Sequence, residues 1–348
     1  MTAGKHPSSL TGRQRTLDFL AGRPTDRPPF HPIIMRWAAR HAGVKYRDFC
    51  QHPPSKCHAM LKAAEDFGLD WVTVMSDPYA EASAFGIKVE YPEDSLPLDR
   101  GHFGSVAELR ALPPYAVDAH PRTAGRLAEI RRFRELAGNR YFIVGWVEGP
   151  VAEYADLRGL TEAAIDFMDE PEQVGAVMDM IVAAAKEFIT RQVEAGADCI
   201  GIGDAFCSQI GPTLFRELAG RRETDLVAHI HRLGAKAKLH ICGNTTAILP
   251  DMIATGADII DVDHLVASMA PFVPLLAPHQ IFSGQADPVA VLQNGSPEMI
   301  AETVRRNFRE AAGRCIISAG CEITPGTSEE NMRIFQNIGQ CIHLQRKY

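Results

Sequence analysis

The sequence predicts an α/β chain folded as a (β/α)8 barrel, or TIM barrel, with an N-terminal helical extension. Short apolar runs alternate with helical patterns eight times along the 348 residues, which favours a barrel of eight strand–helix units. Most of these runs are rich in Val and Ile and continuous rather than alternating, as in strands covered on both faces of a parallel sheet. No linker or low-complexity stretch divides the chain, so we expect one domain over residues 1–348.

Each of the eight predicted strands is short and is followed by a polar loop and a helical pattern. The strands are expected at residues 29–35, 70–75, 141–147, 198–203, 237–241, 257–262, 280–284 and 314–319. A doubly wound open sheet is the alternative fold. That fold has fewer strands and a glycine-rich first turn, and no such turn is present in this sequence.

The predicted helices lie between the strands. The longest covers residues 170–195, and its apolar side chains repeat at helical spacing at Val174, Val177, Met178, Ile181 and Ala185. Further helices are expected near residues 225–233 and over residues 297–312. The second of these begins after Ser296, a residue type that caps helix N-termini.

Charge and hydropathy exclude two classes of protein. The chain carries 36 Lys and Arg against 43 Asp and Glu, a formal charge of −7, which argues against a sequence-independent nucleic-acid binder. No apolar run approaches the ~20 residues that span a bilayer, so no membrane partner is expected. The N-terminus is polar and lacks the apolar core of a signal peptide, which favours a cytoplasmic protein.

Polar and metal-binding side chains stand at the ends of nearly all the predicted strands. In this fold the active site lies at the carboxyl ends of the strands, so these residues are expected to line one pocket. They are Arg36, Arg40, Asp77, Glu148, Asp204, His240, Cys242, Asp263, His264, Gln285, Asp287, Cys321 and Glu322.

The strongest local motif is His240-Ile241-Cys242. Residues two apart in a strand point to the same face, so the imidazole and the thiol are expected to project together at the end of the fifth strand. Nitrogen and thiolate ligands suit zinc, and Cys321, just past the eighth strand, is the candidate third ligand. Three protein ligands leave one position open, the arrangement of catalytic rather than structural zinc.

Most of the remaining cysteines are expected to be free thiols without a role in the site. Cys199 and Cys315 lie in apolar strand-like runs, where a free cysteine usually packs as a small hydrophobic residue. Cys207 lies close to Asp204 and is retained as an alternative metal ligand.

Several motifs resemble the uroporphyrinogen decarboxylase superfamily over essentially the whole chain. They are residues 11–17 (TGRQRTL), residues 22–29 (GRPTDRPP), Glu148-Gly149-Pro150 followed by Leu157-Arg158-Gly159, and residues 284–288 (GQADP). The resemblance implies a (β/α)8 barrel, in agreement with the strand pattern. It also implies one of two activities: metal-free removal of carboxyl groups from uroporphyrinogen, or methyl transfer from a corrinoid protein to an acceptor, often with zinc.

The metal-binding motif favours the methyltransferase branch, which resembles the methylcobamide:coenzyme M methyltransferases. That branch has a His-x-Cys pair and a later Gly-Cys-x-x-x-Pro, matched here by His240, Cys242, Cys321 and Pro325. The decarboxylases have a histidine where this chain has Cys321. Two segments point the other way, because residues 35–40 (MRWAAR) and Ser76-Asp77 resemble decarboxylase motifs. The decarboxylase tyrosine is not matched, and Asp156 falls in its place.

The resemblance implies a methyl-corrinoid supplied by a partner protein, because the chain has no Asp-x-His-x-x-Gly corrinoid motif. The acceptor is either a thiol of the coenzyme M type or tetrahydrofolate. A homodimer is left open. The alternatives are uroporphyrinogen decarboxylase and a non-catalytic barrel that only binds a ligand.

The other strand-end residues receive roles on this basis. Asp204, Glu148 and Asp77 are the candidate catalytic carboxylates, and Arg36, Arg40, Asp263 and Gln285 are candidate substrate-binding residues. Asp204, Glu148 or Asp263 is expected to orient His240 or to occupy the open zinc position. Helix capping by these carboxylates, and ion pairing of the arginines with Asp77 or Glu81, are the alternatives.

Overall fold

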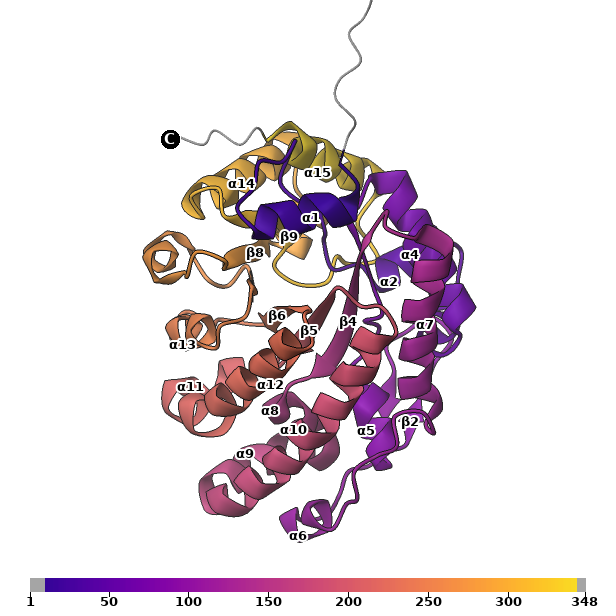
Figure 1. Cartoon of the computed structure of the whole chain (residues 1–348), viewed down its shortest axis with the longest axis vertical. Helices are drawn as coiled ribbons and strands as arrows, with labels where there is room; N and C mark the ends of the chain where they lie inside the picture. Colours follow the sequence, from indigo (N-terminus) through magenta and orange to yellow (C-terminus); the bar gives the residue numbers. More distant parts are fainter. Residues whose placement is uncertain (1–9, 343–348) are drawn as a thin grey trace, which may run out of the picture.

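The computed structural model describes residues 10–342 as one curled, parallel sheet surrounded by helices (Figure 1). Seven strands form the sheet in the order β1-β4-β5-β6-β7-β8-β9. They are β1 (Trp71–Thr73), β4 (Phe142–Glu148), β5 (Cys199–Gly203), β6 (Lys236–Ile241), β7 (Ile259–Val262), β8 (Ile281–Ala286) and β9 (Cys315–Ala319). A separate antiparallel pair joins β2 (Val89–Glu90) to β3 (Leu98–Asp99). The predicted TIM-barrel architecture is confirmed.

The predicted first strand, residues 29–35, is wrong as a regular strand, although part of it closes the barrel. Phe30 forms an isolated parallel bridge with Ile317 of β9. The Ile317 N–H donates to Pro29 O at 2.9 Å, and on the other side the Asp70 N–H donates to Phe30 O at 3.0 Å. Proline lacks an N–H donor, so Pro29 and Pro32 prevent a longer ladder of hydrogen bonds.

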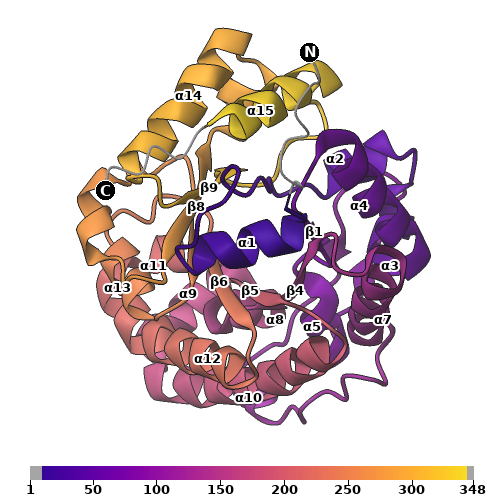
Figure 2. The same cartoon turned by 45° about the horizontal axis from the view of Figure 1, so that its top comes forward.

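Helices surround the sheet in chain order, and the last of them, α15, packs against α4 near the start of the chain (Figure 2). The helices are α1 (Gly12–Leu20), α2 (Arg36–His41), α3 (Tyr46–Gln51), α4 (Pro53–Phe67), α5 (Tyr79–Phe85), α6 (Val106–Arg110), α7 (Pro121–Ala137), α8 (Pro150–Arg158), α9 (Leu160–Asp169), α10 (Pro171–Glu194), α11 (Cys207–Leu214), α12 (Arg221–Arg232), α13 (Leu249–Ala254), α14 (Pro297–Glu310) and α15 (Glu329–Cys341). Short π- and 3-10 helices lie at η1 (Phe215–Gly220), η2 (Ala270–Leu275) and η3 (Pro288–Gln293).

The helices expected from apolar periodicity are confirmed. Helix α10 buries the predicted face that includes Val174, Val177 and Ile181. Helix α14 begins after Ser296, whose Oγ accepts the Met299 N–H at 3.3 Å, as expected for an N-cap. Helix α12 begins at Arg221, four residues before the predicted start at residue 225.

Helix α1, the N-terminal extension, covers one end of the barrel (Figure 2). Phe19 and Leu20 of α1 pack against residues at the beginnings of the strands, among them Trp71, Phe142 and Cys199. The amino ends of the strands are therefore sealed by an apolar layer. The carboxyl ends, where the candidate residues stand, form the other end of the barrel.

Within residues 10–342, no helix is long and apolar enough to cross a lipid bilayer.

Candidate functional site

His240, Cys242 and Cys321 come together at the carboxyl end of the barrel. The Nε2 atom of His240 lies 2.9 Å from the Cys242 sulfur, and that sulfur lies 3.5 Å from the Cys321 sulfur. All three potential ligand atoms lie within 4.8 Å of one another. His240 is buried, whereas both cysteines are partly exposed and neither forms a disulfide. We call these three residues the His-Cys-Cys cluster.

Two glycines shape the loops that carry the cysteines. Gly243 follows Cys242 with a φ of +95°, in the left-handed region that favours glycine. Gly320 precedes Cys321 and touches the neighbouring loop so closely that an added Cβ would lie 2.3 Å from the backbone nitrogen of His264. Its N–H donates to Ala286 O at 2.8 Å, which ties the Cys321 loop to the end of β8.

The donor set of the cluster suits a zinc ion. Hydrogen bonds from Cys242 and His240 lower the pKa of Cys321 to about 4, so this sulfur is a thiolate at neutral pH. The contact with Cys321, together with burial, raises the pKa of Cys242. One imidazole and two converging sulfurs supply three of the four ligands of a tetrahedral zinc site, and Cys321 is already ionised. The residues present therefore fit the metal.

The carboxylate beside His240 is Asp261, a residue that the strand-end reasoning missed. His240 Nδ1 lies 3.1 Å from Asp261 Oδ2, and the same oxygen lies 2.6 Å from Lys238 Nζ. Asp204, Glu148 and Asp263 were expected in this place. The parallel register sets Asp261 directly beside His240, and that register cannot be read from one sequence. A charged residue inside an apolar strand was the available signal.

Asp204 lies in a second, fully buried group. Its carboxylate accepts the Ala152 N–H at 2.6 Å and so caps the start of α8. Its potential ligand oxygens and those of Glu223, together with the Cys207 sulfur, lie within 4.8 Å of one another. Burial raises the pKa of Asp204 to about 6 and that of Glu223 well above its ordinary value. Cys207 thus belongs to this group rather than to the His-Cys-Cys cluster.

Glu148 and Asp77 occupy a buried network of acids and arginines. Glu148 accepts the Trp146 indole N–H at 2.9 Å, and the Trp146 ring centre lies 6.4 Å from that of His240. Burial, with the nearby Glu81, raises the pKa of Glu148 well above its ordinary value. Burial would also raise the pKa of Asp77, but the pairing with Arg122 lowers it overall. Burial therefore favours the protonated form of Glu148, whereas the pairing with Arg122 favours the ionised form of Asp77.

The two arginines hold the loop that follows β9. Arg36 Nη2 lies 3.0 Å from Glu322 Oε2, beside Cys321, and the Arg36 backbone N–H donates to Glu322 Oε1 at 2.9 Å. Arg40 donates to the Pro325 carbonyl and is exposed. Their contacts are thus with this loop and not with Asp77 or Glu81.

Asp263 and Gln285 also make loop contacts. Asp263 accepts the Gly243 N–H at 2.9 Å and the Leu265 N–H at 3.0 Å, so it links the loops after β6 and β7. His264 Nδ1 lies 2.8 Å from Asp263 Oδ1. The Gln285 amide donates to the Val266 carbonyl, whereas its buried Oε1 has no partner among residues 10–342.

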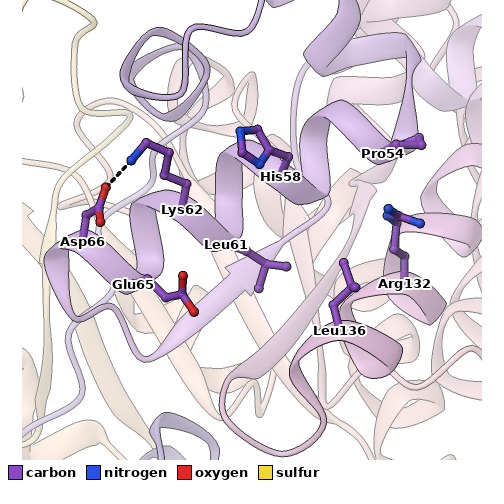
Figure 3. A pocket seen from close by; sticks show the side chains of 8 residues that line it. All are labelled: Pro54, His58, Leu61, Lys62, Glu65, Asp66, Arg132 and Leu136. Atoms are coloured by element: carbon purple, nitrogen blue, oxygen red, sulfur yellow. Dashed lines mark hydrogen bonds and ion pairs between the residues drawn. The ribbon is translucent and has the colours of Figure 1, made fainter.

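A surface pocket of about 410 Å³ lies elsewhere, between the outer helices α4 and α7 (Figure 3). Its walls carry mixed charge, including the Lys62–Asp66 pair at 2.7 Å. It is lined by Pro54, His58, Leu61, Lys62, Glu65, Asp66, Arg132 and Leu136. None of the strand-end residues belongs to it, so it is separate from the His-Cys-Cys cluster.

Comparisons with known proteins agree with this architecture. The family model described as Uroporphyrinogen decarboxylase (URO-D) matches residues 11–340. A protein named uroporphyrinogen decarboxylase from Prochlorococcus marinus (strain MIT 9303) is 26% identical over 338 residues, covering 92% of this chain and 94% of its own. One of the same name from Synechococcus sp. (strain CC9902) is 25% identical over 340 residues, with the same coverage, 92% and 94%.

Two solved structures share the fold. A methyltransferase from Methanosarcina mazei superposes with a TM-score of 0.84 at 23% identity and covers 95% of this chain and 98% of its own. A putative vitamin-B12 independent methionine synthase from Listeria monocytogenes superposes with a TM-score of 0.56 at 12% identity, covering 90% of this chain and 96% of its own.

Proposed function

The chain belongs to the uroporphyrinogen decarboxylase family of enzymes, and on that premise we propose that it is a zinc-dependent methyltransferase. Its donor is a methyl-corrinoid carried by a partner protein, and its acceptor is a thiol of the coenzyme M type or tetrahydrofolate. The observation that carries the proposal is the convergence of His240, Cys242 and Cys321 within 4.8 Å. Metal-free decarboxylation has no need of two thiols beside an imidazole.

His240 Nε2 and the sulfurs of Cys242 and Cys321 would hold the metal. Zinc bound there would keep a thiol acceptor in its thiolate form, which is the nucleophilic one. Three protein ligands leave one tetrahedral position for such an acceptor. The cysteines are partly exposed, so an acceptor can reach them from the carboxyl end of the barrel, because α1 blocks the other end.

The buried acids near the cluster have separate tasks in this proposal. The raised pKa of Glu148 favours its protonated form, which can donate a hydrogen bond to a substrate, and the Trp146 indole fixes its position. Asp77 remains a carboxylate fixed by Arg122 and can accept a hydrogen bond. Asp204 positions α8, because its carboxylate accepts hydrogen bonds from the first backbone N–H groups of that helix.

Uroporphyrinogen decarboxylase is the second candidate function. The specific observation in its favour is the name of the curated relatives, which are 25% and 26% identical to this chain. An ionised Asp77 at the barrel end is also compatible with a substrate that presents N–H groups. If this were the activity, the His-Cys-Cys cluster would take no part in the reaction.

The two functions are separated by paired assays of the purified protein. We expect loss of the methyl group from methylcobalamin in the presence of a thiol or tetrahydrofolate, and no product from uroporphyrinogen above a blank. His240→Ala should abolish the first reaction, because it removes a metal ligand. Sustained decarboxylation of uroporphyrinogen, together with no demethylation by any acceptor, would contradict the proposal.

A further inference from the structure

Strand β6 carries three polar side chains that face the barrel interior at successive levels. Lys238, His240 and Cys242 are two residues apart, so they project from the same face of the strand. Cys242 stands at the rim, His240 below it and Lys238 below His240. Asp261 of β7 pairs in register with His240 and therefore lies at the level of the imidazole.

Asp261 lies between the imidazole and the ammonium group. Its Oδ2 is 2.6 Å from Lys238 Nζ and 3.1 Å from His240 Nδ1. The Asp261 side chain is 0% exposed and that of Lys238 is 2% exposed. An isolated carboxylate would be very unfavourable at such a depth, so the ion pair with Lys238 stabilises Asp261 in this position.

The contacts of His240 assign its two ring nitrogens. Nε2 faces the Cys242 sulfur, and Nδ1 faces Asp261. With a metal ion on Nε2, the imidazole would keep one ring proton, and that proton would belong on Nδ1, 3.1 Å from the Asp261 carboxylate. Nε2, which faces the sulfurs, would then be the ligand atom, and the metal would replace the proton that this nitrogen shares with the sulfurs in the metal-free chain.

An aromatic layer fixes the Lys238 side chain from below. Its ammonium lies 5.9 Å from the centre of the Trp71 ring, and the Trp71 indole N–H donates to Thr16 Oγ1 of α1 at 2.7 Å. His31 stacks on Trp71 with ring centres 4.7 Å apart. Burial and the charge of Lys238 keep the pKa of His31 well below its ordinary value, so His31 adds no second cation.

We infer that Asp261 and Lys238 are positioning residues for the metal centre. Asp261 lies against the imidazole and fixes the orientation of His240, and Lys238 fixes the orientation of Asp261. The inference rests on the proposed function, because it takes the His-Cys-Cys cluster as a zinc site. A carboxylate that holds a metal-bound histidine commonly changes metal affinity about 10- to 100-fold when it is replaced.

The test measures zinc affinity by competition with a chelator, in the full chain and in four variants. We expect Asp261→Asn to lower zinc affinity about 10- to 100-fold. Lys238→Met should also lower zinc affinity, because Asp261 loses the 2.6 Å contact that holds its carboxylate beside His240. The loss of zinc-binding free energy in the double variant K238M/D261N should be smaller than the sum of the losses in the two single variants, because both residues act through one contact. The double variant also buries no unpaired charge, so it keeps the test valid if a single variant fails to fold.

The matched control is Asp258→Asn, the fourth variant. Asp258 is a buried carboxylate directly before β7, but its partners are Lys236 and His231, each at 2.8 Å, and it does not touch the cluster. We expect D258N to leave zinc affinity unchanged, even where it lowers the unfolding temperature of the metal-free chain. The visible spectrum of the cobalt-substituted protein should change in D261N and stay unchanged in D258N.

Two contrary results are distinguishable. Zinc binding by the wild-type chain with equal affinity in D261N and D258N would overturn this inference and leave the proposed function standing. No zinc binding by the wild-type chain would overturn the proposed function, and this inference with it.

Discussion

Cys321 lies 3.5 Å from the sulfur of Cys242, although 79 positions separate the two residues in the sequence. The barrel makes this contact, because β6 and β9 both end at the same rim. The contact changes the chemistry of both thiols, since it lowers the pKa of Cys321 and raises that of Cys242. Cys321 is therefore the residue whose replacement tests the proposed function most sharply.

Replacing Cys321 with Ala should lower zinc affinity and abolish methyl transfer to a thiol. The substitution removes one of two thiolate ligands and leaves a two-ligand site, which holds zinc weakly. The matched control is Cys315→Ala, because Cys315 is buried at the start of β9, at the opposite end of the same strand. Chelator competition and methylcobalamin demethylation measure both effects. Unchanged zinc affinity in C321A, or an equal loss in C315A, would contradict the assignment.

The three residues of the cluster could be predicted because their evidence is local. His240 and Cys242 share a strand face, and Cys321 directly follows a recognisable strand. Asp261 and Lys238 could not be predicted in the same way. Their contacts depend on the register between β6 and β7, and a single sequence contains no record of that register.

At the scale of elements, continuous apolar runs located seven strands, but proline changed the outcome for the eighth. The run over residues 29–35 has the composition of a strand, yet Pro29 and Pro32 cannot donate to a neighbouring strand. The remaining contacts, at Phe30 and His31, are enough to close the barrel against β9. Apolar composition thus predicted the place of this segment in the barrel, but it did not predict whether the segment forms a continuous ladder of strand hydrogen bonds.

Loop contacts also explain why several strand-end residues do not lie in the cluster. Asp204 caps α8, Asp263 joins two loops, and Arg36 holds Glu322. Their sequence position at the strand ends was right. In the structure, their charged groups already form hydrogen bonds or ion pairs with backbone N–H groups or nearby side chains.

Gly320→Ala tests whether the loop after β9 positions Cys321. A Cβ at this position would lie 2.3 Å from the backbone nitrogen of His264, so the loop must shift and carry Cys321 with it. We expect weaker zinc binding, measured by chelator competition, with the barrel still folded by circular dichroism. Gly125→Ala is the control, because an added Cβ in the middle of α7 would meet nothing closer than 3.8 Å. Wild-type zinc affinity in G320A would show that this close approach does not place the ligand.

At the scale of the whole molecule, burial in the barrel raises the pKa of several acids. Burial raises the pKa of Glu148, Glu153 and Glu223 well above their ordinary values, and that of Asp204 to about 6. A group with a raised pKa in the folded state contributes stability that is fully present below its unfolded pKa of about 4. That stability is lost as the pH rises through the folded pKa.

Glu223→Gln isolates one of these acids, because Gln keeps the shape and remains neutral at every pH. We expect the free energy of unfolding of the wild type to fall relative to E223Q as the pH rises above the unfolded pKa of about 4, by up to about 1.4 kcal/mol per pH unit. Urea unfolding between pH 5 and 8 measures the difference. The control Glu330→Gln, exposed at the start of α15, should give a constant difference. A difference that is constant with pH for E223Q as well would show that Glu223 ionises normally in the fold.

The central claim is that the chain holds zinc through His240, Cys242 and Cys321, and the zinc K-edge X-ray absorption spectrum tests it most directly. The account predicts close to one zinc per chain, with two sulfur ligands at about 2.3 Å and at least one nitrogen at about 2.0–2.1 Å. In Cys321→Ala the spectrum should show a single sulfur. A metal shell of nitrogen and oxygen alone, or the same two sulfurs in C321A as in the wild type, would contradict the account.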